Sequence, residues 1–176
     1  LEKGYDVRTI SGEKEAELIY YGVREAVKMT DELSLIIDIG GGSTEFIIAN
    51  KEEILWKQSF LLGAARLLEK FSPSDPITPA EIREINVYLK QDLQPLFEAV
   101  KKYAVTELIG SSGSFDSLAE MIAHRFYSPD ILNDTTEYAF RMSDFETLYE
   151  TILRSTKEDR LQMEGLVEMR VDMIVI

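Results

Sequence analysis

The chain contains no cysteine, which excludes disulfides, zinc–thiolate sites and cysteine nucleophiles. Its single histidine, His124, cannot build a metal site that needs several histidine ligands. No segment approaches the roughly 18–20 consecutive apolar residues of a membrane-spanning helix. The opening residues, "LEKGYDVRTI", lack the apolar core and the cleavage site of a signal peptide. Together these absences predict a cytoplasmic protein.

Positive charge is also in short supply. Lysine and arginine number 19 against 32 acidic residues, which gives a net charge of −13. Such a field repels nucleic acid and anionic membranes, and the sequence offers only short basic pairs such as Lys101-Lys102 to offset it. We therefore expect neither a nucleic-acid partner nor a membrane partner. A polyanionic substrate would need divalent metal as a counterion or a site built from backbone groups.

The chain has 176 residues, 45% of them apolar and 29% charged, which suits one folded domain or one domain with a fragment of another. No methionine precedes the opening residues. The last residues, "VDMIVI", form an apolar run with no capping residue after them. We expect a fragment of a longer protein.

Apolar periodicity predicts alternating strands and helices. The expected strands are residues 5–10, 33–38, 45–50, 53–59 and 107–110. The expected helices are residues 13–28, 63–71, 79–102 with a kink at Pro95, one after residue 114, 143–154 and 158–176. Capping boxes are predicted at Thr78/Glu81 and at Ser143/Glu146. This order indicates an α/β fold, a mixed sheet with helices on both faces.

A glycine-rich loop joins two of the expected strands. Backbone N–H groups hold phosphate well, and glycine lets the backbone approach closely and adopt φ > 0. The candidate phosphate-binding residues, with such amides and two hydroxyls, are Gly40, Gly41, Gly42, Ser43 and Thr44. A strand follows the loop, and no lysine stands in it, so it is neither a P-loop nor a GxGxxG motif.

Two acids flank this loop. Asp38 is placed to hold Mg²⁺ or its water shell, because magnesium prefers one or two carboxylates plus phosphate oxygens. Glu45, across the predicted hairpin from Asp38, is placed to orient a water molecule or the metal. The alternative is a flexible hairpin turn in which Asp38 is a cap and Glu45 is solvated.

A second small-residue segment lies between an expected strand and an expected helix. Its amides at a helix N-terminus suit an anion or a nucleotide. The residues are Gly110, Ser111, Ser112, Gly113 and Ser114. The alternative is an ordinary strand-to-helix turn in which Ser114 is the N-cap.

Glu15 lies in the first turn of the first expected helix. The helix dipole alone accounts for an acid at that position. The functional alternative is a general base that activates water for in-line attack on phosphorus.

Three motifs resemble the exopolyphosphatase / guanosine pentaphosphate phosphatase (Ppx/GppA) family. They are "ISGEKEAELIYYGV" (10–23), "LIIDIGGGSTEFII" (35–48) and "IGSSGSFDSLAEM" (109–121), and "RVDMIV" (170–175) adds to them. The resemblance implies the superfold of actin, sugar kinases and heat-shock chaperone ATPases, with two RNase H-like domains around a cleft. Residues 1–30 would end the first domain and include a linking helix. Residues 31–176 would form the second domain, truncated at its C-terminus.

The resemblance also implies roles for the site residues. Glu15 would be the catalytic base, Asp38 would contact magnesium or the attacking water, and Glu45 would be the second acid of the site. The glycine-rich loop would be the family's second phosphate-binding loop. The segment 111–114 matches the place where related ATPases hold adenosine.

The implied activity is release of terminal phosphate from inorganic polyphosphate with Mg²⁺. The family's first phosphate loop is missing, so we expect the 176-residue fragment to be inactive alone. Guanosine pentaphosphate is the alternative substrate, and a non-catalytic phosphate-binding or nucleotide-binding module is the alternative function. A sugar or acetate kinase is less favoured, because those enzymes lack the SGxxEA helix directly before the DIGGGS strand. A homodimer is a further expectation, driven by apolar surface left where a first domain would pack.

Overall fold

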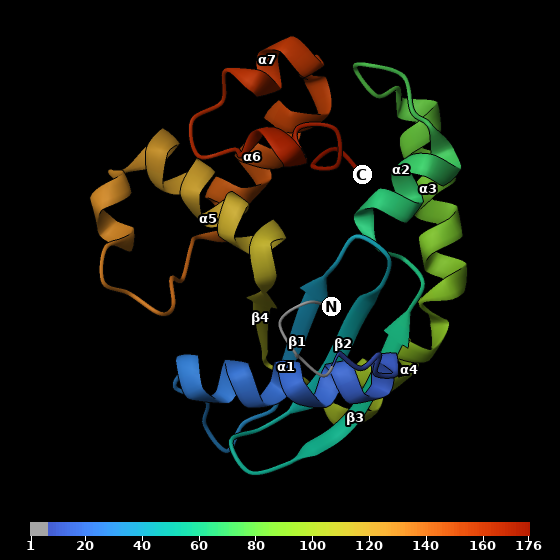
Figure 1. Cartoon of the computed structure of the whole chain (residues 1–176), viewed down its shortest axis with the longest axis vertical. Helices are drawn as coiled ribbons and strands as arrows, with labels where there is room; N and C mark the ends of the chain where they lie inside the picture. The colour runs from blue at the N-terminus through green and yellow to red at the C-terminus, as the bar shows by residue number, and fades with distance from the viewer. Residues whose placement is uncertain (1–6) are drawn as a thin grey trace.

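The sheet of the computed structural model, which describes residues 7–176, contains four strands in the order β3-β2-β1-β4 (Figure 1). β1 pairs antiparallel with β2, β2 pairs antiparallel with β3, and β1 pairs parallel with β4. The strand bounds are β1 Ser34–Ile39, β2 Thr44–Ala49, β3 Ile54–Phe60 and β4 Glu107–Ser111. The predicted mixed sheet is confirmed.

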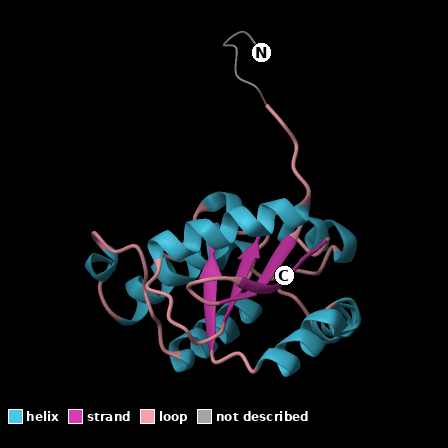
Figure 2. Ribbon diagram, turned by 90° about the horizontal axis from the view of Figure 1, so that it is seen from below, coloured by secondary structure: helices cyan, strands magenta, loops and turns pink. Residues whose placement is uncertain are grey.

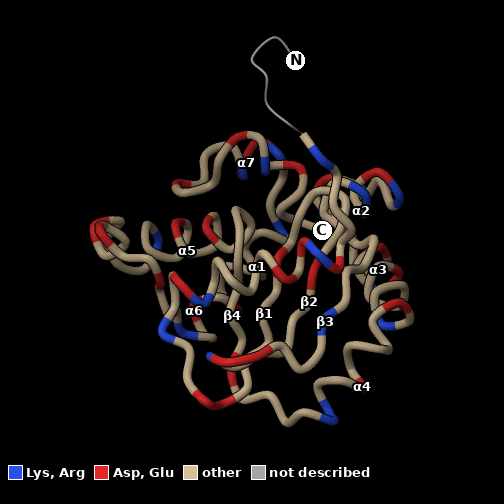
Figure 3. Tube along the Cα trace, turned by 60° about the horizontal axis from the view of Figure 1, so that its bottom comes forward, with Lys and Arg blue, Asp and Glu red and all other residues tan. Residues whose placement is uncertain are grey.

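Helices cover both faces of this sheet (Figure 2). The α-helices are α1 Gly12–Ala26, α2 Ala64–Phe71, α3 Pro79–Asp92, α4 Gln94–Tyr103, α5 Ser112–Phe126, α6 Met142–Arg154 and α7 Lys157–Leu161. Two short 3₁₀ helices occupy Pro129–Leu132 and Glu168–Arg170. Lysine and arginine are scattered among the acidic residues in Figure 3.

The two faces of the sheet pack against different helices because side chains alternate along each strand. On one face Ile36 and Ile47 are fully buried against Tyr20 of α1. On the other face Phe46 packs with Leu67 of α2 and other residues that precede β4. The α1 face and the α2 face of the sheet are therefore distinct surfaces, and the site described below depends on that distinction.

Several helix boundaries follow from capping residues that the sequence predicts. The Thr78 side chain accepts from the amide of Glu81, and the Glu81 side chain accepts from the amide of Thr78, so this capping box is confirmed. The predicted kink near Pro95 is a break at Leu93, which separates α3 from α4.

Other predictions were wrong. The described part of the expected strand 5–10, residues 7–10, has no regular structure, and residues 5 and 6 lie outside the described residues. Ser143 caps nothing, because α6 begins at Met142 and the Ser143 hydroxyl donates to Asp144. Instead of a helix over 158–176, the chain forms α7, turns and a 3₁₀ turn, with Gly165 in the left-handed region at φ +83°.

Candidate active site

Polar side chains form one row across the sheet near the C-terminal end of β1. Asp38 pairs with Glu45, Glu45 pairs with Ser59, and Asp38 also pairs with Ser111 on β4. Directly paired residues project from the same face of a sheet. Asp38 and Glu45 stand two residues from Ile36 and Ile47, so the row continues the α1 face. The prediction that Glu45 lies across the hairpin from Asp38 is confirmed.

Glu45 is a buried carboxylate, with 1% of its surface exposed. Ser59 donates its hydroxyl to Oε1 of Glu45 over 2.6 Å. Helix α1 starts directly above them, since a Cβ on Gly12 would lie 2.4 Å from Oγ of Ser59. No described residue donates to Oε2 of Glu45. Among the described residues no fully buried side-chain oxygen lacks a hydrogen-bond partner, so Oε2 is not a buried orphan and keeps enough access to meet a cation or a proton donor. The alternative of a solvated Glu45 is excluded.

Glu15 faces the same acids from the first turn of α1. Partial burial raises the pKa of the Glu15 carboxyl, and the charges of Glu45 and Asp38 raise it further. A carboxyl whose pKa is raised toward the working pH is a better general base, because its proton affinity is higher while it is still ionised. The structure therefore brings Glu15, Asp38 and Glu45 together, as the sequence predicts.

The carbonyls of all three glycines of the loop are held by α2. The amide of Ala64 donates to the Gly40 carbonyl over 2.9 Å, and the amide of Arg66 donates to the Gly41 carbonyl over 3.1 Å. The Arg66 side chain completes the set, since its Nε donates to the Gly42 carbonyl over 2.9 Å. Three successive peptide units are thus fixed from one side.

The amides of the loop consequently point the other way. The loop peptides are trans, and in a planar trans peptide the N–H and the C=O point in opposite directions. The N–H groups of Gly41, Gly42 and Ser43 are therefore directed away from α2. None of them donates to another described residue. Successive unpaired amides that converge on one side form an anion-binding nest.

Two details of the loop differ from expectation. Positive φ occurs at Gly165 but not at any of the three loop glycines, so left-handed geometry is not why glycine stands there. The Thr44 hydroxyl donates to the Leu62 carbonyl over 3.1 Å. Because a hydroxyl has one proton, Thr44 holds the loop in place while Ser43 keeps a hydroxyl with no bond to a described residue.

The second small-residue segment is not a loop. β4 ends at Ser111 and α5 begins at Ser112, whose φ is +67°, so strand and helix join directly. Ser111 rather than Ser114 is the N-cap residue, and it makes no side-chain capping bond. Ser114 instead donates to the Ile39 carbonyl over 3.3 Å.

The glycines of this segment make room for the protein's own side chains. A Cβ on Gly110 would lie 2.0 Å from the Phe115 ring, and a Cβ on Gly113 would lie 1.8 Å from Nη2 of Arg170. Arg170 also donates to the Ser114 hydroxyl over 3.4 Å. Sequence reasoning missed Arg170, although it opens the motif "RVDMIV".

A cavity of about 790 Å³ connects the two segments. Its polar end includes Asp38, Gly40 and Gly41 from the loop, the residues 112–114 and Arg170. Most of the remaining lining is apolar and comes from α3, α5, α6 and the last residues of the chain. Glu15 and Glu45 do not line it, so Asp38 is the one acid of the three that belongs both to the row on the α1 face and to this cavity.

One buried arginine of α7 joins three segments that are separate in the sequence. Arg160, 3% exposed, donates from Nη2 to Asp75 in the connection between α2 and α3, over 2.8 Å. It also donates to the carbonyls of Ser155 and Val171. The backbone amide of Lys157 and the Arg160 guanidinium lower the pKa of the Asp75 carboxyl. No local sequence pattern indicates this connection.

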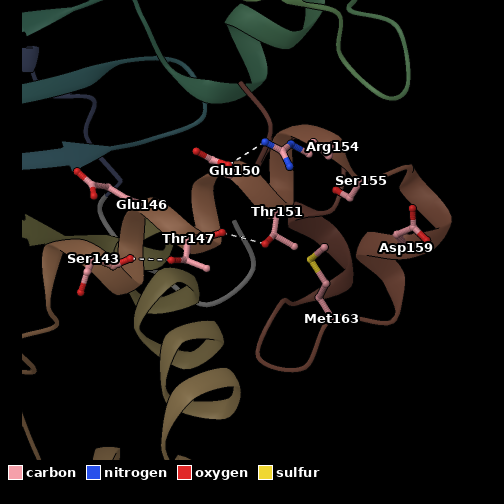
Figure 4. A pocket seen from close by; sticks show the side chains of 9 residues that line it. All are labelled: Ser143, Glu146, Thr147, Glu150, Thr151, Arg154, Ser155, Asp159 and Met163. Carbon is pink, nitrogen blue, oxygen red and sulfur yellow. Dashed lines mark hydrogen bonds and ion pairs between the residues drawn. The ribbon is translucent and has the colours of Figure 1, made fainter.

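A second hollow, of about 770 Å³, lies along α6 and the turn that follows it (Figure 4). Most of its polar side chains are already engaged: Thr147 and Thr151 donate to carbonyls of their own helix, and Arg154 pairs with Glu150. None of the predicted site residues lines it, so we assign it no chemistry.

A protein-only metal site is absent from residues 7–176, where no three acidic or histidine side chains cluster suitably. Asp38 and Glu45 nevertheless fit Mg²⁺, which needs only one or two carboxylates when phosphate oxygens and water complete its shell. Over the same residues, no helix has the length and apolarity to cross a membrane.

Comparison with known proteins places these features in context. The model of the Ppx/GppA phosphatase family matches residues 2–176. A curated relative from Haemophilus influenzae is 29% identical over 171 residues, which are 97% of this chain and 50% of that protein.

Solved structures of the same family also match this chain. An exopolyphosphatase from Cytophaga hutchinsonii is 43% identical with a TM-score of 0.89, over 97% of this chain and 55% of the other. The Aquifex aeolicus member of the Ppx/GppA family is 23% identical with a TM-score of 0.82, over 99% and 55%. The chain thus spans about half the length of these proteins. The predicted RNase H-like fold of the actin-like superfold is confirmed.

Proposed function

Since the chain belongs to the Ppx/GppA phosphatase family, we propose that it forms one half of the active site of an exopolyphosphatase. The reaction is release of the terminal phosphate of inorganic polyphosphate by in-line attack of water. One observation carries the proposal: the amides of Gly41, Gly42 and Ser43, which donate to no described residue, lie in the loop between Asp38 and Glu45, the two acids whose charges act on Glu15.

Each group has a role that its geometry supports. The three amides and the Ser43 hydroxyl bind phosphoryl oxygens and stabilise the charge that develops on them. Glu15 accepts the proton of the attacking water, and its raised pKa suits that task. The carboxylates of Asp38 and Glu45 would hold Mg²⁺, and the Ser59 hydroxyl keeps Glu45 in place. When bound, Mg²⁺ neutralises phosphate charge that a chain of net charge −13 would otherwise repel.

The chain needs its other half for turnover under this proposal. Four expectations stay predictions. They are that residues 1–30 end a first domain, that residues 31–176 form a truncated second domain, that the protein is cytoplasmic and that it forms a homodimer. The test is an assay of the full-length protein and of the 176-residue chain on long polyphosphate, with Mg²⁺ and with excess EDTA. We expect activity only in the full-length protein with Mg²⁺. Full-length rates from the 176-residue chain, or full activity in EDTA, would contradict the proposal.

The second candidate is hydrolysis of guanosine pentaphosphate, and the apolar cavity favours it. Inorganic polyphosphate has no apolar part, whereas a nucleoside could fill the space lined by residues such as Leu89, Phe115 and Leu118 beside the loop. Comparing kcat/KM on both substrates in one preparation decides between them. A non-catalytic binding module is the remaining alternative, and it predicts ligand binding with no turnover of either substrate.

A further inference from the structure

One of the groups that hold the glycine-rich loop is a side chain outside it. Arg66 is exposed on α2 and makes no ion pair within the described residues. Its backbone amide and its Nε hold two successive loop carbonyls, those of Gly41 and Gly42. An arginine on a helix surface ordinarily has no reason to keep this conformation, so the two bonds to one loop are a specific feature of this structure.

We propose that Arg66 is a positioning residue that orients the last amide of the phosphate nest. The bond from Nε fixes the carbonyl of the Gly42–Ser43 peptide. Because that peptide is planar and trans, fixing its C=O also fixes the direction of the Ser43 N–H. Without the bond, this peptide would be the only one of the three not held by α2, and it could rotate. The inference rests on the proposal that the loop binds phosphate.

The rest of the contact between α2 and the loop is formed by closely packed backbone. A Cβ on Gly63 would lie 2.4 Å from the carbonyl carbon and oxygen of Gly41, so the start of α2 touches the loop backbone directly. The amides of Ala64 and Arg66 then hold the first two carbonyls with backbone groups that no substitution other than proline removes. Only the third carbonyl depends on a side chain, which makes that side chain the one that mutation can test.

Two substitutions separate the donor from the charge. In Arg66→Gln the amide nitrogen is attached to Cδ, as Nε is in arginine, so the donor is kept and the charge is lost. In Arg66→Met the length is kept and both donor and charge are lost. Arg83, an exposed arginine on α3, supplies the control substitution Arg83→Met.

The measurement is binding of inorganic tripolyphosphate to the full-length protein by calorimetry, with amide NMR shifts of Gly42 and Ser43 recorded without ligand. We expect Arg66→Met to bind roughly threefold to tenfold more weakly, the range for loss of one hydrogen bond, and to shift both amides. Arg66→Gln and Arg83→Met should match the unsubstituted protein in both readouts.

The outcomes distinguish the two proposals. If Arg66→Gln loses as much affinity as Arg66→Met, the charge contacts the anion and the positioning role is wrong. If Arg66→Met changes neither readout, Arg66 has no role in the loop. If the unsubstituted protein does not bind tripolyphosphate, the proposed function fails, and the ligand-free amide shifts alone decide whether Arg66 holds the Gly42–Ser43 peptide.

Discussion

The segments 40–44 and 110–114 have nearly the same composition but opposite structures. In the first, α2 takes the carbonyls, which leaves amides free on the other side. In the second, the chain passes straight from strand to helix, and its glycines are covered by Phe115 and Arg170. The difference teaches that glycine and serine content does not define an anion site. What matters is which backbone groups the neighbouring elements already occupy.

The largest expected difference between the two segments is in catalysis. Glu15→Gln in the full-length protein should lower kcat by a factor of about 10²–10⁴, the usual contribution of a general base, while ligand binding is retained. The matched change beside the second segment is Asp116→Asn, an exposed acid in the first turns of α5, which should leave kcat unchanged. Steady-state kinetics on polyphosphate measure both. Unchanged turnover in Glu15→Gln would remove the base from the mechanism.

The next effect concerns crowded glycines. Gly63→Ala places a methyl group 2.4 Å from the backbone of Gly41, which cannot move aside alone, so we expect a loss of about 1–3 kcal/mol in the free energy of unfolding. Gly113→Ala meets the end of the flexible Arg170 side chain, and a smaller loss is expected. Urea denaturation of both variants tests this order. Equal losses would mean that the loop is no more rigidly packed than the second segment.

A smaller effect separates ligand binding from the stability of the fold. A Cβ on Gly42 meets nothing within 4 Å, and its φ is not positive. Gly42→Val should therefore leave the melting temperature unchanged yet weaken tripolyphosphate binding by about tenfold through the steric conflict, with Gly42→Ala intermediate. Full affinity in Gly42→Val would show that the anion does not approach this glycine.

The smallest expected effect is on stability against pH. The folded state raises the pKa of the Glu15 carboxyl above its ordinary value, so it binds the proton more tightly than the unfolded chain does. Stability should then fall slightly as pH rises from the ordinary carboxyl pKa through the raised one. Glu15→Gln should lack this step when melting temperatures are compared across acidic to neutral pH. A step of the opposite sign would mean that the neighbouring acids do not raise the pKa of the Glu15 carboxyl.

Local pattern was enough to predict the four strands of the sheet, the hairpin register of Asp38 and Glu45, and the position of Glu15 in α1. Each depends on apolar periodicity or on a short motif within one element. The contributions of Ser59, Arg66 and Arg170 were missed because each reaches the site from another element, through contacts that no spacing encodes. The same reason explains the wrong prediction of a second loop, since the space above Gly113 is filled by a residue distant in sequence.

Arg160 can also serve as an intrinsic NMR probe. Its Nε–H is buried and bonded to the Val171 carbonyl, while its Nη2 donates to Asp75 in the connection between α2 and α3. A protected guanidinium proton exchanges slowly with solvent and gives an NMR signal that stands apart from those of exposed arginines. One resonance in ¹⁵N-arginine-labelled protein therefore reports whether α7 separates from the residues it is bonded to when a ligand binds, without any probe being attached to the molecule.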